Sequence, residues 1–330
     1  MYVPQSYLAA LVLLTLCMLG WGSWPNICKA LPKWRIDYFY LDYTFGFLLG
    51  ALICAATLGS TAAVGLAFLT RLSEAGRLPA GCALLAGFLW NAGNVLLLRS
   101  IMMAGLAVAF PIASVPALGL GVGISYWTQP IGNPLWLAAS VGFLLLAGRA
   151  NAAAYGRLGP ASETRRPKGV GSALAAGVLI GLFPPFVARA MSGHGGLDPY
   201  TASLYFMLGA LPATLISVPA LLAPPSNGST GILRGYLRGK TTWHLAGLLA
   251  GVIWSFGTVA NFLSAKMVGM AISWGFASGT TLVAALWGIF LWREFHHAHH
   301  DAKILMGLSL VLYVIGVSAV AAAYSAASIP

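Results

Sequence analysis

Long apolar runs separated by short polar loops make up most of this chain. A hydrocarbon core about 30 Å thick needs about 20 apolar residues of helix, whereas strands of a membrane barrel are about 10 residues long and alternate strictly. The runs have the helical length and are apolar on every face. The pattern predicts an all-α membrane protein with ten transmembrane helices, near residues 7–28, 41–63, 79–98, 104–127, 134–153, 169–190, 200–222, 242–265, 269–292 and 303–325.

The pattern is also repeated. Residues 84–114 return without a gap, 164 positions later, as residues 248–278, and thirteen of the thirty-one aligned positions are identical. Leu and Ala matches mean little in so apolar a chain, but the Trp and Gly matches are informative. A duplicated set of apolar segments is typical of transporters built from two related halves.

Weaker matches extend the repeat toward the start of each half. Residues 49–52 recur as residues 208–211, and Trp24-Pro25 aligns with Phe183-Pro184. Each half then holds five spans, and an odd number places the second copy upside down in the bilayer. We therefore predict two inverted five-helix repeats, residues 1–160 and 161–330, with the loop 155–168 as the linker.

Composition narrows the class further. Hydrophobic residues make up 59% of the chain, charged residues 8%, and the mean hydropathy is +0.83, which indicates an integral membrane protein. No basic residue precedes Lys29, so the first run lacks the basic start of a signal peptide and is expected to remain a span. The net charge of +11 is spread singly over short loops, which argues against a nucleic-acid partner and makes the lipid bilayer the expected surroundings.

Lys and Arg placement predicts the orientation, because cytoplasmic loops carry an excess of both. With the N-terminus outside, fourteen fall on the cytoplasmic side and four on the outer side, so both termini are expected outside a cell (inner) membrane. The cytoplasmic set is Lys29, Lys33, Arg35, Arg99, Arg149, Arg157, Arg165, Arg166, Lys168, Arg234, Arg238, Lys240, Arg293 and Lys303. The outer set is Arg71, Arg77, Arg189 and Lys266.

Polar groups at bilayer depth are costly and are therefore candidates for function. Aligned faces of the third and eighth spans carry tryptophans and small polar residues, and we predict that they share a substrate cavity; joining helices by hydrogen bonds is the structural alternative. Interrupted helices near Trp24-Pro25, Pro111 with Pro116, Pro184-Pro185 and Trp274-Gly275 are the second expectation. The predicted substrate-binding residues are Trp24, Trp90, Asn91, Asn94, Trp254, Thr258, Asn261 and Trp274.

Two carboxylates are close enough to membrane depth to titrate in a coupling step: Asp42, at the start of the second span, and Glu294, at the end of the ninth. Each could instead pair with a basic neighbour at the interface. His296 and His300 are one helical turn apart, but without a nearby cysteine we predict no metal and no cofactor. No catalytic set of side chains is visible, so we do not expect an enzyme.

Several short motifs resemble known transporters. Gly22-Ser23-Trp24-Pro25 at the end of the first of ten spans resembles the drug/metabolite transporter superfamily. Tyr40-Leu41-Asp42-Tyr43, Ala92-Gly93-Asn94 and the Leu-Trp-Arg-Glu ending at Glu294 resemble the ureide permeases. Gly20-Trp21-Gly22-Ser23 and Lys266-Met267-Val268-Gly269 resemble the glucose/ribose porters. The large central loop of plant ureide permeases has no counterpart here.

The likeness to the ureide permeases implies proton-coupled uptake of allantoin-type ureides or nucleobases, and the likeness to the glucose/ribose porters implies sugar uptake. The sequence thus predicts a secondary active transporter of a small uncharged polar metabolite, working by alternating access with H⁺ as the coupling ion. A sugar porter is the alternative within this class, and a non-transporting receptor or assembly subunit is the alternative outside it. The oligomeric state is left open.

Overall fold

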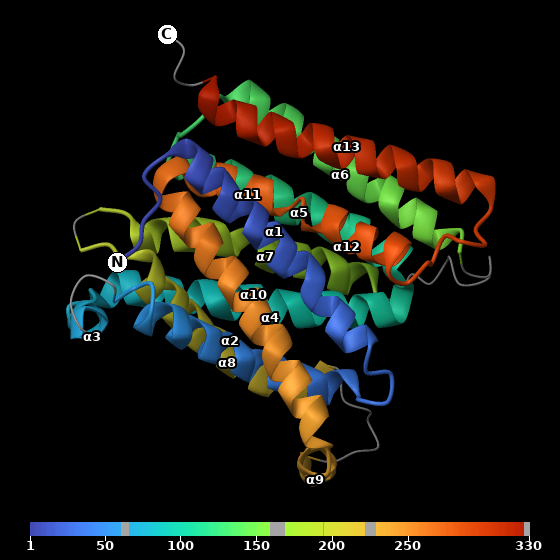
Figure 1. Cartoon of the computed structure of the whole chain (residues 1–330), viewed down its shortest axis with the longest axis horizontal. Coiled ribbons are helices and arrows are strands. Elements are labelled where there is room, and N and C mark those ends of the chain that lie inside the picture. Colours follow the sequence, from blue (N-terminus) through green and yellow to red (C-terminus); the bar gives the residue numbers. More distant parts are fainter. Residues whose placement is uncertain (61–65, 159–168, 194, 222–228, 327–330) are drawn as a thin grey trace.

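The computed structural model describes residues 1–60, 66–158, 169–193, 195–221 and 229–326, and this part of the chain forms thirteen helices (Figure 1). They are α1 (Tyr7–Lys29), α2 (Ile36–Ala56), α3 (Leu66–Ser73), α4 (Arg77–Ala104), α5 (Leu106–Thr128), α6 (Pro134–Gly156), α7 (Val170–Met191), α8 (Pro199–Leu221), α9 (Ser229–Leu237), α10 (Thr241–Val268), α11 (Met270–Ala277), α12 (Thr280–Phe290) and α13 (His300–Ser325).

The all-helical architecture with ten candidate membrane spans is confirmed. The spans are α1, α2, α4, α5, α6, α7, α8, α10, the pair α11 and α12, and α13, while α3 and α9 are short connecting helices. Boundaries moved most at α2, which begins five residues before the predicted start. Predicted positions 61–63 and 222, and most of the predicted linker, lie outside the described residues.

Helix breaks were predicted in the wrong places. α1 continues through Pro25, α5 through Pro111 and Pro116, and α7 through Pro184 and Pro185. Proline is tolerated inside membrane helices because neighbouring groups satisfy the freed backbone. The ninth span is the divided one, and its break lies at residues 278–279, after the predicted Trp274-Gly275.

The central repeat is reproduced in the backbone. α4 and α10 begin and end 164 residues apart, and each is followed by a glycine in almost the same conformation: φ 81° and ψ 157° at Gly105, φ 83° and ψ 156° at Gly269. A positive φ is strained for residues with a Cβ, which explains why glycine recurs at this joint.

Glycines also bring the two halves together at matching contacts. A Cβ at Gly87 of α4 would overlap the Phe206 carbonyl of α8, and a Cβ at Gly251 of α10 would overlap the Tyr43 carbonyl of α2. The contacts are reciprocal. Gly209 of α8 approaches the carbonyl of Leu84 on α4, and Gly46 of α2 approaches that of Leu248 on α10.

These contacts correct one alignment. They match Gly46 with Gly209, 163 positions apart, whereas the sequence match of 49–52 with 208–211 implied 159. The difference is about one helical turn. The halves therefore make equivalent contacts with each other, and the upside-down relation of the second half remains our prediction.

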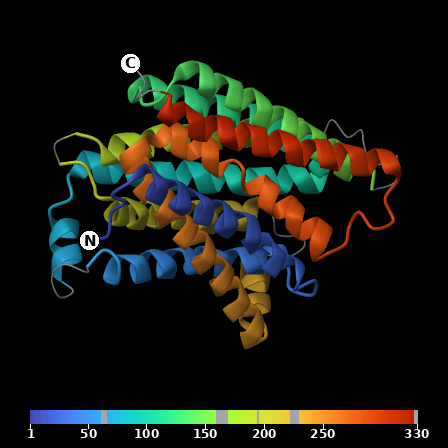
Figure 2. The same cartoon turned by 45° about the horizontal axis from the view of Figure 1, so that its top comes forward.

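The remaining spans surround this crossing. α6 and α13 run side by side along one edge, as both views show (Figures 1 and 2). Tyr7 at the start of α1 stacks on Tyr324 near the end of α13, with ring centroids 4.7 Å apart. The first and last spans thus have their terminal ends on the same side of the molecule, as an even number of spans requires.

Substituting Gly87 with Ala tests the close crossing of α4 and α8. The added methyl group has no space beside the Phe206 carbonyl, so we expect Gly87→Ala to lower the free energy of unfolding by about 1–3 kcal/mol. Gly119→Ala on α5 is the control, because its Cβ meets no atom within 4 Å. Thermal unfolding in detergent measures both, and equal melting temperatures would contradict the contact.

Candidate functional site

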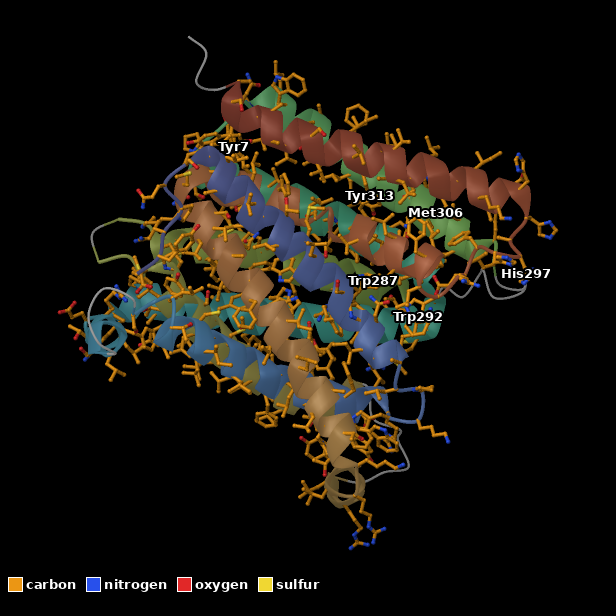
Figure 3. All side chains as sticks on the ribbon, in the orientation of Figure 1. Tyr7, Trp287, Trp292, His297, Met306 and Tyr313 are labelled. Atoms are coloured by element: carbon orange, nitrogen blue, oxygen red, sulfur yellow. The ribbon has the colours of Figure 1, made fainter. Side chains whose placement is uncertain are left out.

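A cavity of about 210 Å³ lies between spans of both halves. Its aromatic lining comes from Trp21, Trp90, Phe110, Trp274 and Tyr313, and its polar lining from Asn94, Ser114, Ser278, Thr280 and Thr281. Tyr313, marked in Figure 3, contributes to the lining from α13. Among the described residues that line the cavity, none carries a charge. The site therefore combines flat apolar faces with uncharged hydrogen-bonding groups.

Three predicted binding residues line this cavity: Trp90, Asn94 and Trp274. Asn94 donates its amide N–H to the Tyr40 hydroxyl at 2.8 Å, which fixes its side chain from α2. Trp274 donates its indole N–H to the Ala117 carbonyl of α5 at 3.1 Å. Both polar groups are held by protein partners, so the cavity wall is formed in advance of any ligand.

Trp254 lies behind the cavity wall and supports it. Its ring stacks on Trp90 with centroids 4.2 Å apart and on Trp21 with centroids 5.5 Å apart and planes within 9°. The Trp21 indole N–H, in turn, donates to the Thr258 hydroxyl at 3.1 Å. Trp254 and Thr258 are therefore placed to act through Trp21 and Trp90, since neither contributes to the described lining.

Other predicted residues join helices instead of lining the cavity. Asn91 accepts a hydrogen bond from the Tyr40 hydroxyl at 2.6 Å and donates to the Ala210 carbonyl at 2.7 Å. Asn261 donates to the Ser273 carbonyl at 3.2 Å, and the Ser273 hydroxyl donates back to the Asn261 carbonyl at 2.9 Å. These bonds tie α4 to α8 and α10 to α11.

Trp24 is also separate from the described lining. Its ring stacks on Tyr43 with centroids 4.1 Å apart and on Phe39 at 6.4 Å, so it anchors α1 to α2. Sequence reasoning chose Trp24 because of the proline that follows it. α1 continues through Pro25, so the helix break expected beside Trp24 is not present.

The structure adds lining residues that sequence reasoning missed. Trp21 belongs to a motif quoted for its resemblance to sugar porters. Ser114 and Ser278 are the last matched pair of the central repeat, and each hydroxyl donates to the carbonyl four residues earlier, at 2.7 Å and 2.8 Å. The preceding aligned pair in the cavity is Phe110 and Trp274. Residues matched by the repeat therefore meet in one cavity, a signal available in the sequence.

Asp42 is 2% exposed and is bound by three side chains. The Tyr236 hydroxyl donates to it at 2.5 Å, the Trp34 indole N–H at 3.3 Å, and Nδ1 of His244 lies 2.9 Å away. Burial, followed by the hydrogen bond to this carboxylate, raises the pKa of Tyr236, so its hydroxyl stays protonated and acts as the donor. The cluster joins α2 of the first half to α9 and α10 of the second.

Glu294 lies in a different ion pair. It binds the Lys29 ammonium and accepts a hydrogen bond from the Tyr155 hydroxyl at 2.8 Å. The contacts tie the end of α1 and the end of α6 to the turn after α12.

Comparison with known proteins finds distant similarity to one family of transporters. The ureide permease family model matches residues 164–323. Ureide permease 1 and ureide permease 2 of Arabidopsis thaliana are each 23% identical, over 96% of this chain and 97% and 98% of their own length. The chain is thus similar to the ureide permeases along nearly its whole length, and this likeness agrees with the predicted membrane transporter.

Two further matches of this chain are to a curated protein and to a solved structure. The glucose uptake protein GlcU of Staphylococcus xylosus is 25% identical over 69% of the chain and 74% of that protein. A solved structure, described only as the crystal structure of a protein, superposes with a TM-score of 0.67 at 14% identity and covers 98% of this chain and all of that one. The structural likeness supports the fold alone.

Two asparagines three positions apart on α4 give a matched test of the cavity. Asn94 lines it and Asn91 lies behind it. If Asn94 binds solute, Asn94→Ala leaves a buried polar group of the substrate unpaired, at about 1–3 kcal/mol, and raises the half-saturating concentration roughly ten- to a hundred-fold. Asn91→Ala should instead lower the melting temperature. Transport kinetics and thermal unfolding of both variants check this, and the reverse pattern would move the site.

Proposed function

We propose that this protein is a secondary active transporter of a small, uncharged, polar metabolite of the ureide or nucleobase type. The observation that carries the proposal is the uncharged, tryptophan-lined cavity at which the aligned spans of both halves meet. The names of the plant relatives point to the same class of solute.

The chemistry of the cavity supports an uncharged solute. A charged solute at this depth would need an opposite charge, because burying an unpaired charge is costly. A planar heterocycle instead stacks on indole faces and exchanges hydrogen bonds with an amide and several hydroxyls. The cavity volume of about 210 Å³ lies below the 300–1,000 Å³ typical of sites for drug-sized ligands, which favours a small molecule.

Alternating access is the mechanism that we propose. Both halves contribute to the cavity and approach each other through glycine contacts at the crossings. Rigid-body rocking of one inverted half against the other about a fixed central site would open the cavity to each side in turn.

Sugar uptake is the second candidate, and the match to GlcU is the observation that favours it. Sugars also stack on tryptophan and exchange several hydrogen bonds, so the lining alone does not separate the two solute classes. A receptor or assembly subunit without transport is the remaining alternative.

Uptake by purified protein in liposomes tests the function. Under an inward proton gradient we expect accumulation of a labelled ureide or nucleobase, and we expect unlabelled members of that class, but not glucose or ribose, to compete. Accumulation of sugars alone would establish the second candidate. Failure of every solute to accumulate, in vesicles where the protein is folded and oriented, would favour the receptor.

We further propose Asp42 as the proton site. Its carboxylate faces His244, which adds an attractive positive charge only when protonated, and it is inaccessible to water in this conformation. α2 also carries Tyr40, which holds cavity residue Asn94, so one helix connects the proposed proton site to the proposed solute site. Glu294 is the less favoured coupling group because it is paired with Lys29 at the end of its span.

Asp42→Asn separates coupling from transport. Asparagine keeps the shape and one acceptor oxygen but cannot exchange a proton, so we expect accumulation driven by a pH gradient to disappear while exchange of solute across the membrane continues. Asp37→Asn is the control, because Asp37 lies on the same helix, is 1% exposed and pairs with Arg35. Full pH-driven accumulation by Asp42→Asn would exclude Asp42 as the coupling site.

A further inference from the structure

A second cavity lies where α12 ends and α13 begins, away from the central site. It is an open groove of about 590 Å³, and Figure 3 marks Met306 and His297 at this end of the molecule. Its basic rim is formed by Arg293, His296 and Lys303, and its apolar floor by Ile289, Phe290, Phe295, Met306, Gly307 and Leu310. We propose that this groove binds an anionic glycerophospholipid, with the phosphate on the basic rim and an acyl chain along the floor.

The charges around the groove favour an anion. No carboxylate is among its described lining residues, and the nearest acidic side chains in sequence are occupied elsewhere. Glu294 binds Lys29, and Asp301 lies 3.9 Å from Arg157. The Lys303 ammonium donates to a backbone carbonyl, that of His296, at 3.3 Å. Two permanent positive charges thus face one groove, and a phosphate would neutralise their repulsion.

Arg293 occupies a backbone position that glycine normally takes. It is the non-glycine residue with a positive φ (51°) in the described part of the chain. It follows the end of α12, in the turn where the Glu294 N–H donates to the Gly288 carbonyl at 3.1 Å. A positive φ is a conformation that glycine adopts more readily than residues with a Cβ. An arginine kept in this strained conformation points to a role for its side chain.

The flanking tryptophans favour a position for this groove at the depth of a lipid headgroup. Trp287 and Trp292 precede it, and tryptophans gather at the membrane interface. Their indole N–H groups donate to Ser23 and Asn26 of α1, which holds the turn in place. From Lys303 to Leu310, α13 advances about 10 Å toward the bilayer centre. Phe290 is 75% exposed beside this path, so an acyl chain would meet apolar side chains.

A phospholipid explains the groove better than a free phosphate does. Free phosphate would use the rim alone and leave the apolar floor without a function. Basic pockets at the ends of membrane helices are suited to anionic headgroups, and each basic residue near the surface strengthens their binding. The proposal does not depend on the solute that the central cavity carries.

Native mass spectrometry of the purified protein tests the proposal with dioleoyl phosphatidylglycerol and dioleoyl phosphatidylcholine. We expect the wild-type protein to retain phosphatidylglycerol preferentially, and inorganic phosphate in the millimolar range not to displace it. Equal retention of both lipids, or displacement by inorganic phosphate, would overturn the proposal.

Two variants examine the two parts of the groove without endangering the fold. Arg293→Gly relieves the positive φ and removes the charge, so we expect a melting temperature at least equal to that of the wild type but roughly five-fold weaker phosphatidylglycerol binding. Gly307→Leu fills the floor, and a Cβ at Gly307 meets no atom within 4 Å, so it should fold normally and lose lipid.

Matched controls lie at the same end of the molecule. Lys33→Gln removes an exposed charge from the α1–α2 loop, and Gly171→Leu adds a side chain on α7 where a Cβ also meets no atom within 4 Å. Both should retain phosphatidylglycerol like the wild type. Unchanged binding by Arg293→Gly or Gly307→Leu, or an equal loss in the controls, would show that the groove is not the lipid site.

Discussion

Close backbone contact at the crossing of the two halves is the constraint on which the rest of the molecule depends. Lipid tails are as apolar as leucine, so membrane helices gain little from hiding apolar side chains and associate through close packing. Gly46 with Gly251, and Gly87 with Gly209, let α2 and α10, and α4 and α8, approach until carbonyls occupy the space of absent Cβ atoms. The tryptophans stack in the centre because the backbones are this close.

The fold could be predicted from the sequence because its signals are local and repeated. Apolar run length gave all ten spans, and the match of 84–114 with 248–278 gave helices whose ends coincide to the residue. Helix breaks were harder, because a proline breaks a helix only if nothing nearby satisfies the freed carbonyl. That depends on neighbouring helices, which residue order does not specify. The shift between α2 and α8 was missed because Gly and Leu recur so often that several alignments score alike.

The candidate site was predicted only in part, for a geometric reason. A helical face several turns long can be assigned from spacing, but which of its residues reaches a cavity depends on the neighbouring helix. Asn91 and Asn94 are three residues apart on α4, yet one binds α8 and the other lines the cavity. Trp90 and Trp254 are aligned partners, yet only Trp90 belongs to the described lining. Equivalence in the repeat does not mean equal exposure within one conformation.

The unequal exposure of aligned residues has a consequence for the direction of transport. If the halves exchange conformations during transport, each residue takes over the place of its aligned partner. A site presented by Trp90 and Asn94 would become one presented by their aligned partners Trp254 and Thr258. An amide would be exchanged for a hydroxyl. The same solute would then be held with different strength at the two membrane faces. Transport would therefore be faster in one direction than in the other, because the two halves differ in sequence.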